Sequence, residues 1–168
     1  MSTMMNEIEI NTKQLPNAEF LPFVVSQLNS VEGKTVTLPL RGRSMRPFLE
    51  DQRDKALLIA CHQPKVGDAV LAEISKGHFV LHRIIGIANN QVTLRGDGNI
   101  GCEYCHLQDI QAKAIGFYRK GREKIDSTAG FKWKLYSWLW TRLFPFRRYL
   151  LFILYPHIPK RFKWNNNQ

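Results

Sequence analysis

A serine, a histidine and an aspartate in this chain have the types and surroundings that nucleophilic catalysis requires. Ser44 lies in the segment RGRSMRP, where a strand-like apolar run ends. Gly42 before the serine and Pro47 after it interrupt both strand and helix, so the hydroxyl could point into a cleft. A serine beside glycine and proline is also typical of an ordinary turn. The interpretation of Ser44 therefore depends on whether the chain supplies a base.

His82 is the candidate base. It lies in the apolar segment FVLHRII, where a period of two places it on one face with Val80 and Ile84. An imidazole between two aliphatic side chains is partly desolvated, which favours the neutral form that a general base requires. Arg83 cannot be the base, because a guanidinium does not lose its proton in proteins. A structural histidine bonded to a backbone carbonyl is the alternative.

Asp97 follows a predicted strand, in the segment RGDGN. Gly96 and Gly98 would let this turn approach another backbone segment closely, and Asn99 could bond the loop backbone or add a polar contact. In that position Asp97 could accept a hydrogen bond from the histidine ring and fix its tautomer. A plain Asp-Gly turn is the alternative.

Together, the three residues supply Ser-His-Asp chemistry. Ser44 would attack, His82 would take the proton, and Asp97 would orient the imidazole. The backbone N–H of Ser44, at a chain break with Gly42 close by, is a candidate donor to the oxyanion.

The elements that must position these residues are mainly short strands. Short apolar runs alternate with turn pairs such as Asn89-Asn90, which indicates an antiparallel, barrel-like or sandwich β domain. A helix that begins near Asn17 and ends at Gly33 is expected to pack over one end of the sheet. The predicted strands are 35–40, 55–60, 69–74, 79–87, 91–94 and 110–118.

The positive charge of the chain is concentrated at its C-terminal end. The net charge is +10, of which residues 1–126 carry +2 and residues 127–168 carry +8 with no acidic residue. Basic residues beside Trp, Phe and Leu suit a segment that lies on an anionic membrane, so we expect residues 131–164 to contact one. Two helices packed back on the β core are the alternative. No nucleic-acid motif accompanies the charge, so nucleic acid is not expected as a partner.

The cysteines favour a reducing setting. Cys61, Cys102 and Cys105 are odd in number, which argues against a disulfide framework. Residues 1–17 lack the features of a signal peptide. We therefore expect a cytoplasmic protein, peripheral on the inner face of the membrane. The segment CEYCH (102–106) fits a c-type haem pattern or part of a zinc site, but we favour a loop with reduced thiols and expect neither metal nor cofactor.

Four segments resemble, in order and approximate spacing, the boxes of type I signal peptidases and the related LexA-like serine peptidases. His82 stands where bacterial signal peptidases have lysine and where archaeal and endoplasmic-reticulum enzymes have histidine, so the chain resembles the Ser-His branch. The resemblance covers about residues 34–120. The matching segments are GRSMRP (42–47), VGDAVL (66–71), HRIIG (82–86) and GDGN (96–99).

This resemblance implies a mainly β fold with an antiparallel catalytic core of the signal-peptidase/LexA-like kind. Residues 34–124 would form that core, after a polar arm and packing helix in 1–33 and before a linker and basic aromatic helical tail in 125–168. Met45 and Pro47 would shape the turn beside the nucleophile.

The expected function is that of a serine endopeptidase. The resemblance implies that it would bind an extended peptide or protein precursor along a strand edge and cleave after a small residue through an acyl-enzyme. Two features depart from the family: no transmembrane helix precedes the serine box, and Gly98 separates Asp97 from Asn99. A conventional signal peptidase is therefore not expected. A peptide-binding or membrane-tethered adaptor with an idle triad is the alternative.

Overall fold

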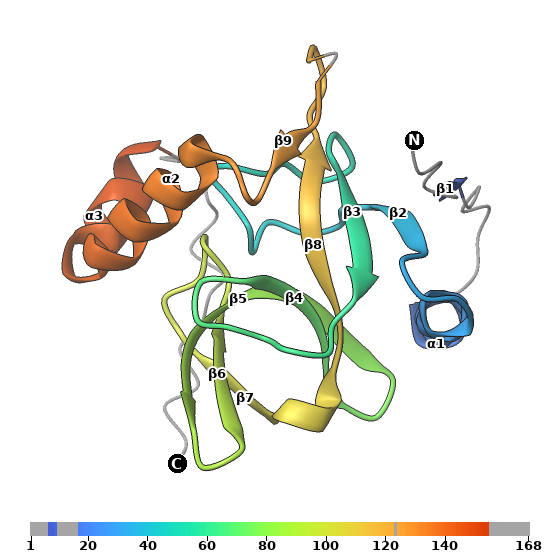
Figure 1. Cartoon of the computed structure of the whole chain (residues 1–168). Helices are drawn as coiled ribbons and strands as arrows, with labels where there is room; N and C mark the ends of the chain where they lie inside the picture. Colours follow the sequence, from blue (N-terminus) through green and yellow to red (C-terminus); the bar gives the residue numbers. More distant parts are fainter. Residues whose placement is uncertain (1–6, 10–16, 123, 155–168) are drawn as a thin grey trace.

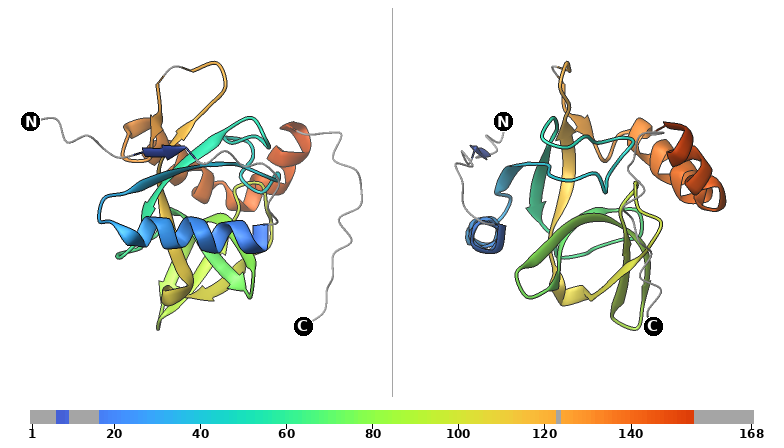
Figure 2. Two further views of the ribbon diagram at one scale, coloured as in Figure 1. Left: turned by 90° about the vertical axis from the view of Figure 1, so that its right-hand side faces the viewer. Right: turned by 180° about the vertical axis from the view of Figure 1, so that it is seen from behind.

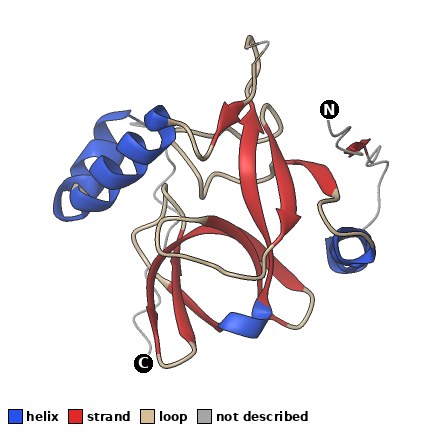
Figure 3. Ribbon diagram, viewed as in Figure 1, coloured by secondary structure: helices blue, strands red, loops and turns tan. Residues whose placement is uncertain are grey.

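One large, mainly antiparallel sheet forms the body of the protein in its computed structural model, which describes residues 7–9, 17–122 and 124–154 (Figure 1; Figure 3). Its strands follow the order β1-β2-β3-β8-β4-β5-β6-β7, and β9 pairs with β8. Neighbouring strands are antiparallel except for β1 and β2. The strands are β1 (Glu7–Glu9), β2 (Thr35–Pro39), β3 (Lys55–Ala60), β4 (Ala69–Ser75), β5 (His78–Ala88), β6 (Gln91–Arg95), β7 (Glu103–His106), β8 (Ile110–Tyr118) and β9 (Asp126–Ser127).

The expectation of a mainly β fold is confirmed at this level, and the six predicted strands are present as β2–β6 and β8. Asn89 and Asn90 form the turn between β5 and β6 with positive φ angles of 47° and 67°, which asparagine tolerates better than most residues. The prediction of a loop at 102–106 was wrong, because β7 lies there. Its polar sequence carries little strand signal, and it extends because its backbone pairs with β6.

The buried side chains form two hydrophobic clusters that pack against the sheet. The first lies between α1 (Asn17–Ser30) and strands β2, β3, β4 and β8. The predicted packing helix is confirmed: Val24 and Leu28 of α1 are fully buried, and Gly33 follows the helix with a positive φ. The second cluster is enclosed by strands β4 to β7, which curl around it (Figure 1).

The tail forms two helices, α2 (Phe131–Arg142) and α3 (Phe144–Leu154). They lie on the opposite side of the sheet from α1 (Figure 2). Trp133 of α2 is buried in the first cluster, where its ring lies 4.9 Å from that of Phe117 on β8 and 5.0 Å from that of Phe48. The tail helices therefore pack on the β core through one of their faces, which is the alternative to membrane contact that the sequence left open. None of the described helices is long and apolar enough to cross a bilayer.

Replacement of Trp133 by alanine should destabilise the protein strongly. Trp133 is 4% exposed, and its removal would leave a large cavity beside Phe48 and Phe117, which costs roughly 3–5 kcal/mol. Trp138 on the same helix is 56% exposed, so Trp138→Ala is the matched control, with an expected loss of about 0.5 kcal/mol or less. Urea unfolding measures both, and equal losses would contradict the docking of α2.

Candidate active site

The turn that carries Asp97 packs directly against the backbone that carries Ser44. The N–H of Gly98 donates to the carbonyl oxygen of Ser44 at 2.7 Å. A Cβ on Gly96 would lie 2.4 Å from that same oxygen, and a Cβ on Gly98 would lie 2.6 Å from the carbonyl oxygen of Arg43. Real Cβ atoms do not approach backbone so closely, so both positions require glycine. The close approach predicted for these two glycines is what the structure shows.

His82 reaches the same turn from the strand β5. The side chain is 3% exposed, and its neighbours Val80 and Ile84 both belong to the second cluster, as the period of two predicted. Its Nε2 lies 3.0 Å from the position of a Cβ on Gly96, as does Nδ2 of Asn99. Ser44, His82 and Asn99 therefore converge on Gly96, although they come from three separate segments.

Glu103 on β7 holds the other ring nitrogen of His82. Its Oε2 makes a short contact with Nδ1 of the imidazole. A carboxylate acceptor at Nδ1 favours the neutral tautomer that carries its proton there. Nε2 is then the nitrogen left to accept a proton, and it lies against Gly96, as does the carbonyl oxygen of Ser44. This is the tautomer that a general base for a hydroxyl group requires.

The role predicted for Asp97, to orient the imidazole, is not what the structure shows. Both carboxylate oxygens of Asp97 accept hydrogen bonds from Arg83, at 2.9 Å from Nε and 2.7 Å from the terminal nitrogen. His82 and Arg83 are consecutive on a strand, so their side chains point to opposite faces. Asp97 lies on the face of Arg83, whereas Glu103 lies on the face of His82.

The ion pair of Arg83 and Asp97 is almost completely buried, since each side chain is 1% exposed. Burial alone would lower the pKa of Arg83, but the charge and hydrogen bonds of Asp97 outweigh it and hold that pKa above its ordinary value. Arg83 also donates to the carbonyl oxygen of Gly67 at 3.0 Å and to the hydroxyl of Ser137. Its guanidinium lies 4.7 Å from the ring centre of Trp133. Each of the three nitrogens of this cation thus donates at least one hydrogen bond.

Side chains of helices α2 and α3 form hydrogen bonds with the Gly96–Asn99 turn. The hydroxyl of Tyr136 donates to the Asp97 carboxylate at 3.1 Å, and Nε1 of Trp140 donates to the Asp97 carbonyl oxygen at 2.8 Å. Burial, followed by the nearby charge of Asp97, raises the pKa of Tyr136 well above its ordinary value, so the phenol remains a donor. Arg147 of α3 donates to the carbonyl oxygen of Trp140 at 3.0 Å and contacts that of Asn99 at 3.5 Å.

The segment that presents Ser44 is anchored at both ends. Gly42 has a φ of 88° and donates its N–H to Asp51 at 2.8 Å, and the Arg46–Pro47 bond is cis. Met45 is buried in the first cluster, whereas Ser44 itself is half-buried. Gly42 and Met45 therefore attach the segment to its surroundings, while the shaping of the turn by Pro47 and the support of an oxyanion by all three residues stay predictions.

Asp54 holds the C-terminal end of that segment through hydrogen bonds. Its side chain is fully buried and accepts hydrogen bonds from Arg53, from the N–H of Glu50 at 2.9 Å and from the N–H of Lys120 at 3.3 Å. Burial opposes ionisation, but these hydrogen bonds outweigh it and hold the pKa of Asp54 below 3.8. Asp54 thus joins the serine segment to the end of β8.

Glu103 and Arg83 are the two residues of this region whose roles the sequence reasoning missed. Glu103 stood in a segment interpreted as a loop, so its facing was not considered. A period of two through EYCH places Glu103 on the same face as Cys105, which is buried in the second cluster with Ile84 of β5. The signal for Arg83 is its position inside an apolar strand, because an arginine buried there requires an acid as partner.

The cysteine-rich segment does not gather metal ligands in the part of the chain that the structure describes. Cys61, Cys102 and Cys105 form no disulfide there. Cys105 points into the second cluster, where burial raises the pKa of its thiol to about 11, while its neighbour His106 is exposed. The two cannot easily share an ion, because consecutive strand residues point to opposite faces.

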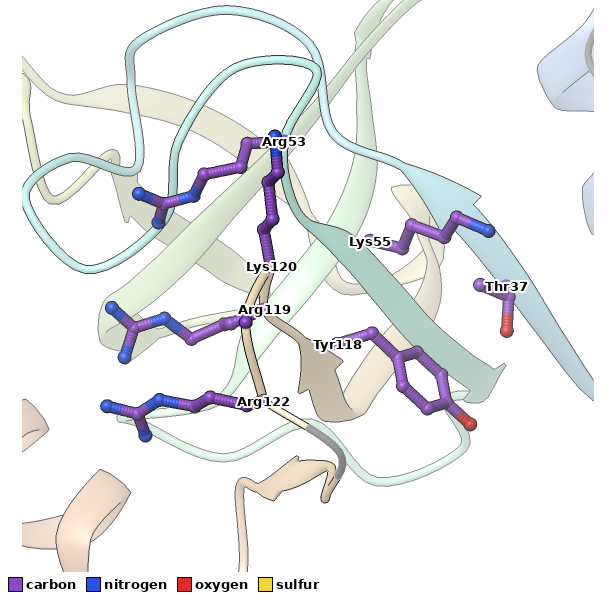
Figure 4. A pocket seen from close by; sticks show the side chains of 8 residues that line it. Thr37, Arg53, Lys55, Tyr118, Arg119, Lys120 and Arg122 are labelled. Atoms are coloured by element: carbon purple, nitrogen blue, oxygen red, sulfur yellow. The ribbon is translucent and has the colours of Figure 1, made fainter.

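A basic pocket of about 620 Å³ lies away from this site, around the ends of β3 and β8 (Figure 4). Arg53 pairs with Asp54, and both Arg119 and Arg122 pair with Asp126. The pocket is therefore partly neutralised. Its lining residues are Thr37, Arg53, Lys55, Tyr118, Arg119, Lys120, Gly121 and Arg122.

Comparison with protein-family models gave no match to this chain, and comparison with curated proteins gave none either. The interpretation of the site therefore depends on its own geometry.

Removal of the Arg83 cation should be costly, because it leaves the Asp97 carboxylate buried without its charged partner. We expect Arg83→Met to lower the free energy of unfolding by roughly 3–5 kcal/mol. Arg122→Met is the matched control: that arginine is 48% exposed in its pair with Asp126, and exposed pairs contribute about 1 kcal/mol or less. The double variant Arg83→Met/Asp97→Leu should recover stability. Urea unfolding that ranks the two single variants equally would contradict this assignment.

The stabilisation supplied by Asp54 should depend on pH. Its pKa in the folded protein lies below the ordinary 3.8, so its contribution is complete above that pH and is lost as the pH falls through the folded-state value. Near neutral pH, Asp54→Asn should lower the free energy of unfolding by about 1–3 kcal/mol. The difference between wild type and variant should shrink in acid. A difference that stays constant down to the folded-state pKa would contradict the shift.

Proposed function

We propose that this protein is a serine endopeptidase of the signal-peptidase-like type, with Ser44 as nucleophile, His82 as general base and Glu103 as the residue that orients the base. The observation that carries the proposal is the convergence on Gly96. Nε2 of His82 and the main chain of Ser44 meet there, while Glu103 occupies Nδ1. Glu103 replaces Asp97 in the role first predicted for that residue.

The chemistry would proceed in two halves. Oγ of Ser44 attacks the carbonyl carbon of the scissile peptide bond, and Nε2 of His82 takes the hydroxyl proton. The imidazolium gives this proton to the leaving amine, which leaves an ester on Ser44. Water then attacks the ester with His82 again as base, and the imidazolium returns that proton to Oγ of Ser44 as the bond to the acyl group breaks and the new carboxylic acid is released. The carboxylate of Glu103 stabilises the imidazolium in both halves.

The strand β5 offers an edge on which a peptide substrate could lie. His78–Arg83 pair with β4 on one side, and β6 begins to pair only at Arg83. Among the described strands, the stretch just before His82 is therefore paired on one side only. An extended peptide that added there would receive main-chain hydrogen bonds next to the base. This agrees with the strand-edge binding that the family resemblance implies.

An adaptor with an idle triad would need only the peptide-binding edge. Peptide binding alone would not require a carboxylate at Nδ1 of His82, nor Nε2 of that ring close to the Ser44 segment. We therefore favour the enzyme, and reactivity of Ser44 distinguishes the two.

A fluorophosphonate probe, which needs no knowledge of the substrate, should label Ser44 in the full chain. Labelling should disappear in Ser44→Ala and fall by up to roughly 10⁴-fold in His82→Ala. Glu103→Gln should slow labelling because the amide no longer favours the Nδ1–H tautomer or stabilises the imidazolium. Rates are measured by gel fluorescence or mass spectrometry of the labelled peptide.

Glu73→Gln is the matched control, since this glutamate lies on β4 and accepts a hydrogen bond from Gly77 in a turn. It should label at the wild-type rate. Folded wild-type protein that does not react, or variants of His82 and Glu103 that react normally, would reject the peptidase and favour the adaptor.

A further inference from the structure

Helices α2 and α3 carry apolar side chains on their outer faces as well as on their inner ones. Of the fourteen large hydrophobic side chains that the described residues expose, ten lie on these two helices. Trp138 is 56% exposed, while Phe152 and Ile153 are 71% and 72% exposed. The ten are Phe131, Leu135, Trp138, Leu139, Phe144, Phe146, Tyr149, Phe152, Ile153 and Leu154. We call this set the outer face, apart from Phe144, whose ring centre lies 3.8 Å from the guanidinium of Arg95 on β6. Exposed apolar side chains concentrated on two neighbouring helices indicate an interaction site.

The charges around the outer face have one sign. Lys132, Lys134, Arg142 and Arg148 are exposed on the two helices, and residues 127–168 contain no acidic residue. The guanidinium of Arg142 lies 5.2 Å from the ring centre of Trp138, so a cation and an aromatic ring lie side by side on this surface. Long basic side chains can keep their charge in the headgroup region while their stems cover apolar surface.

The helices are too short to cross a membrane but suit its surface. Their 12 and 11 residues correspond to about 18 and 16 Å, against a hydrocarbon core of ~30 Å. Helices with Trp, Phe and Leu beside Lys and Arg lie in the interface, with the apolar side chains in the acyl boundary and the cations near anionic headgroups.

We propose that the outer face of α2 and α3 binds an anionic membrane surface. Because Tyr136, Trp140 and Arg147 on the inner side of the same helices hold the Gly96–Asn99 turn, membrane contact would fix the candidate site beside the lipid. The substrate class would then be peptide segments at the membrane surface. That last step rests on the proposed peptidase function, whereas lipid binding itself does not require Ser44 to react.

Vesicle flotation of the full chain tests the binding directly. The protein should float with vesicles of phosphatidylcholine and phosphatidylglycerol, should remain unbound with phosphatidylcholine alone, and should be released by high salt. Lys132→Gln/Lys134→Gln should weaken binding by about fivefold for each charge removed. Phe152→Ser/Ile153→Ser should weaken it by roughly tenfold or more.

Matched controls lie outside the two helices. Phe23 on α1 is 49% exposed, and Lys76 occupies the exposed turn between β4 and β5. Phe23→Ser and Lys76→Gln should bind vesicles as the wild type does. Fluorophosphonate labelling of every variant, measured in parallel without lipid, separates failure of membrane binding from failure of the peptidase proposal.

Tryptophan quenching locates the contact. Trp133 and Trp140 are buried, Trp138 is exposed, and Trp164 lies outside the described residues and is replaced in a Trp164→Phe background. Brominated lipid should quench Trp138 in this background, and the quenching should disappear in Trp138→Phe.

Three results would overturn the proposal. One is equal binding to neutral and anionic vesicles, or binding to neither. Another is loss of binding in the Phe23 and Lys76 controls to the same extent as in the outer-face variants. The third is a concentration-dependent dimer, seen by sedimentation, that the outer-face variants abolish while vesicle binding is absent, since that result would assign the surface to a second copy.

Discussion

The buried ion pair between Arg83 and Asp97 is the interaction on which the rest of the site depends. Two charges that are each 1% exposed lose nearly all of their hydration, and only close, well-directed partners offset this cost. Arg83 makes two bonds to the carboxylate, while Tyr136 adds a third contact to the acid. These partners come from β5, from the turn after β6 and from α2. The pair therefore fixes the turn relative to both the sheet and the tail helix.

Side chains alternate along β5, so the proposed base His82 and the structural residue Arg83 lie on opposite faces of the strand. His82 faces β7 and the second cluster, where Glu103 meets it, and Arg83 faces the tail helices. A shift of one residue would exchange these surroundings, which would bury the guanidinium without its acid and leave the imidazole without its carboxylate. The register of β5 with β4 and β6 is thus a requirement of both the fold and the proposed chemistry. Gly96 and Gly98 are a second requirement of the site, because only glycine leaves room for the backbone of the Ser44 segment.

The tail combines two kinds of contact on the same helices. Trp133, Tyr136 and Trp140 recur at helical spacing and face the sheet, so the inner face is explained by packing and by the hydrogen bonds to Asp97. On the outer face, Trp138 and Phe152 are exposed and take no part in the first hydrophobic cluster. The two readings of this segment that the sequence left open, packing on the core and contact with a membrane, are therefore compatible, because they concern opposite faces.

The sequence by itself determined six of the nine described strands, since alternation and turn residues act locally, and it predicted Ser44, His82 and the glycine turn as neighbours. It could not decide which acid serves which base. Asp97 and Glu103 lie six positions apart, and only the pairing of β6 with β7 brings Glu103 to the face of His82. It could not place β7 either, because a polar stretch carries little strand signal and is extended here by its pairing with β6. The tertiary structure assigned Asp97 to Arg83 for a physical reason: a buried guanidinium must have a carboxylate on its own side of the strand.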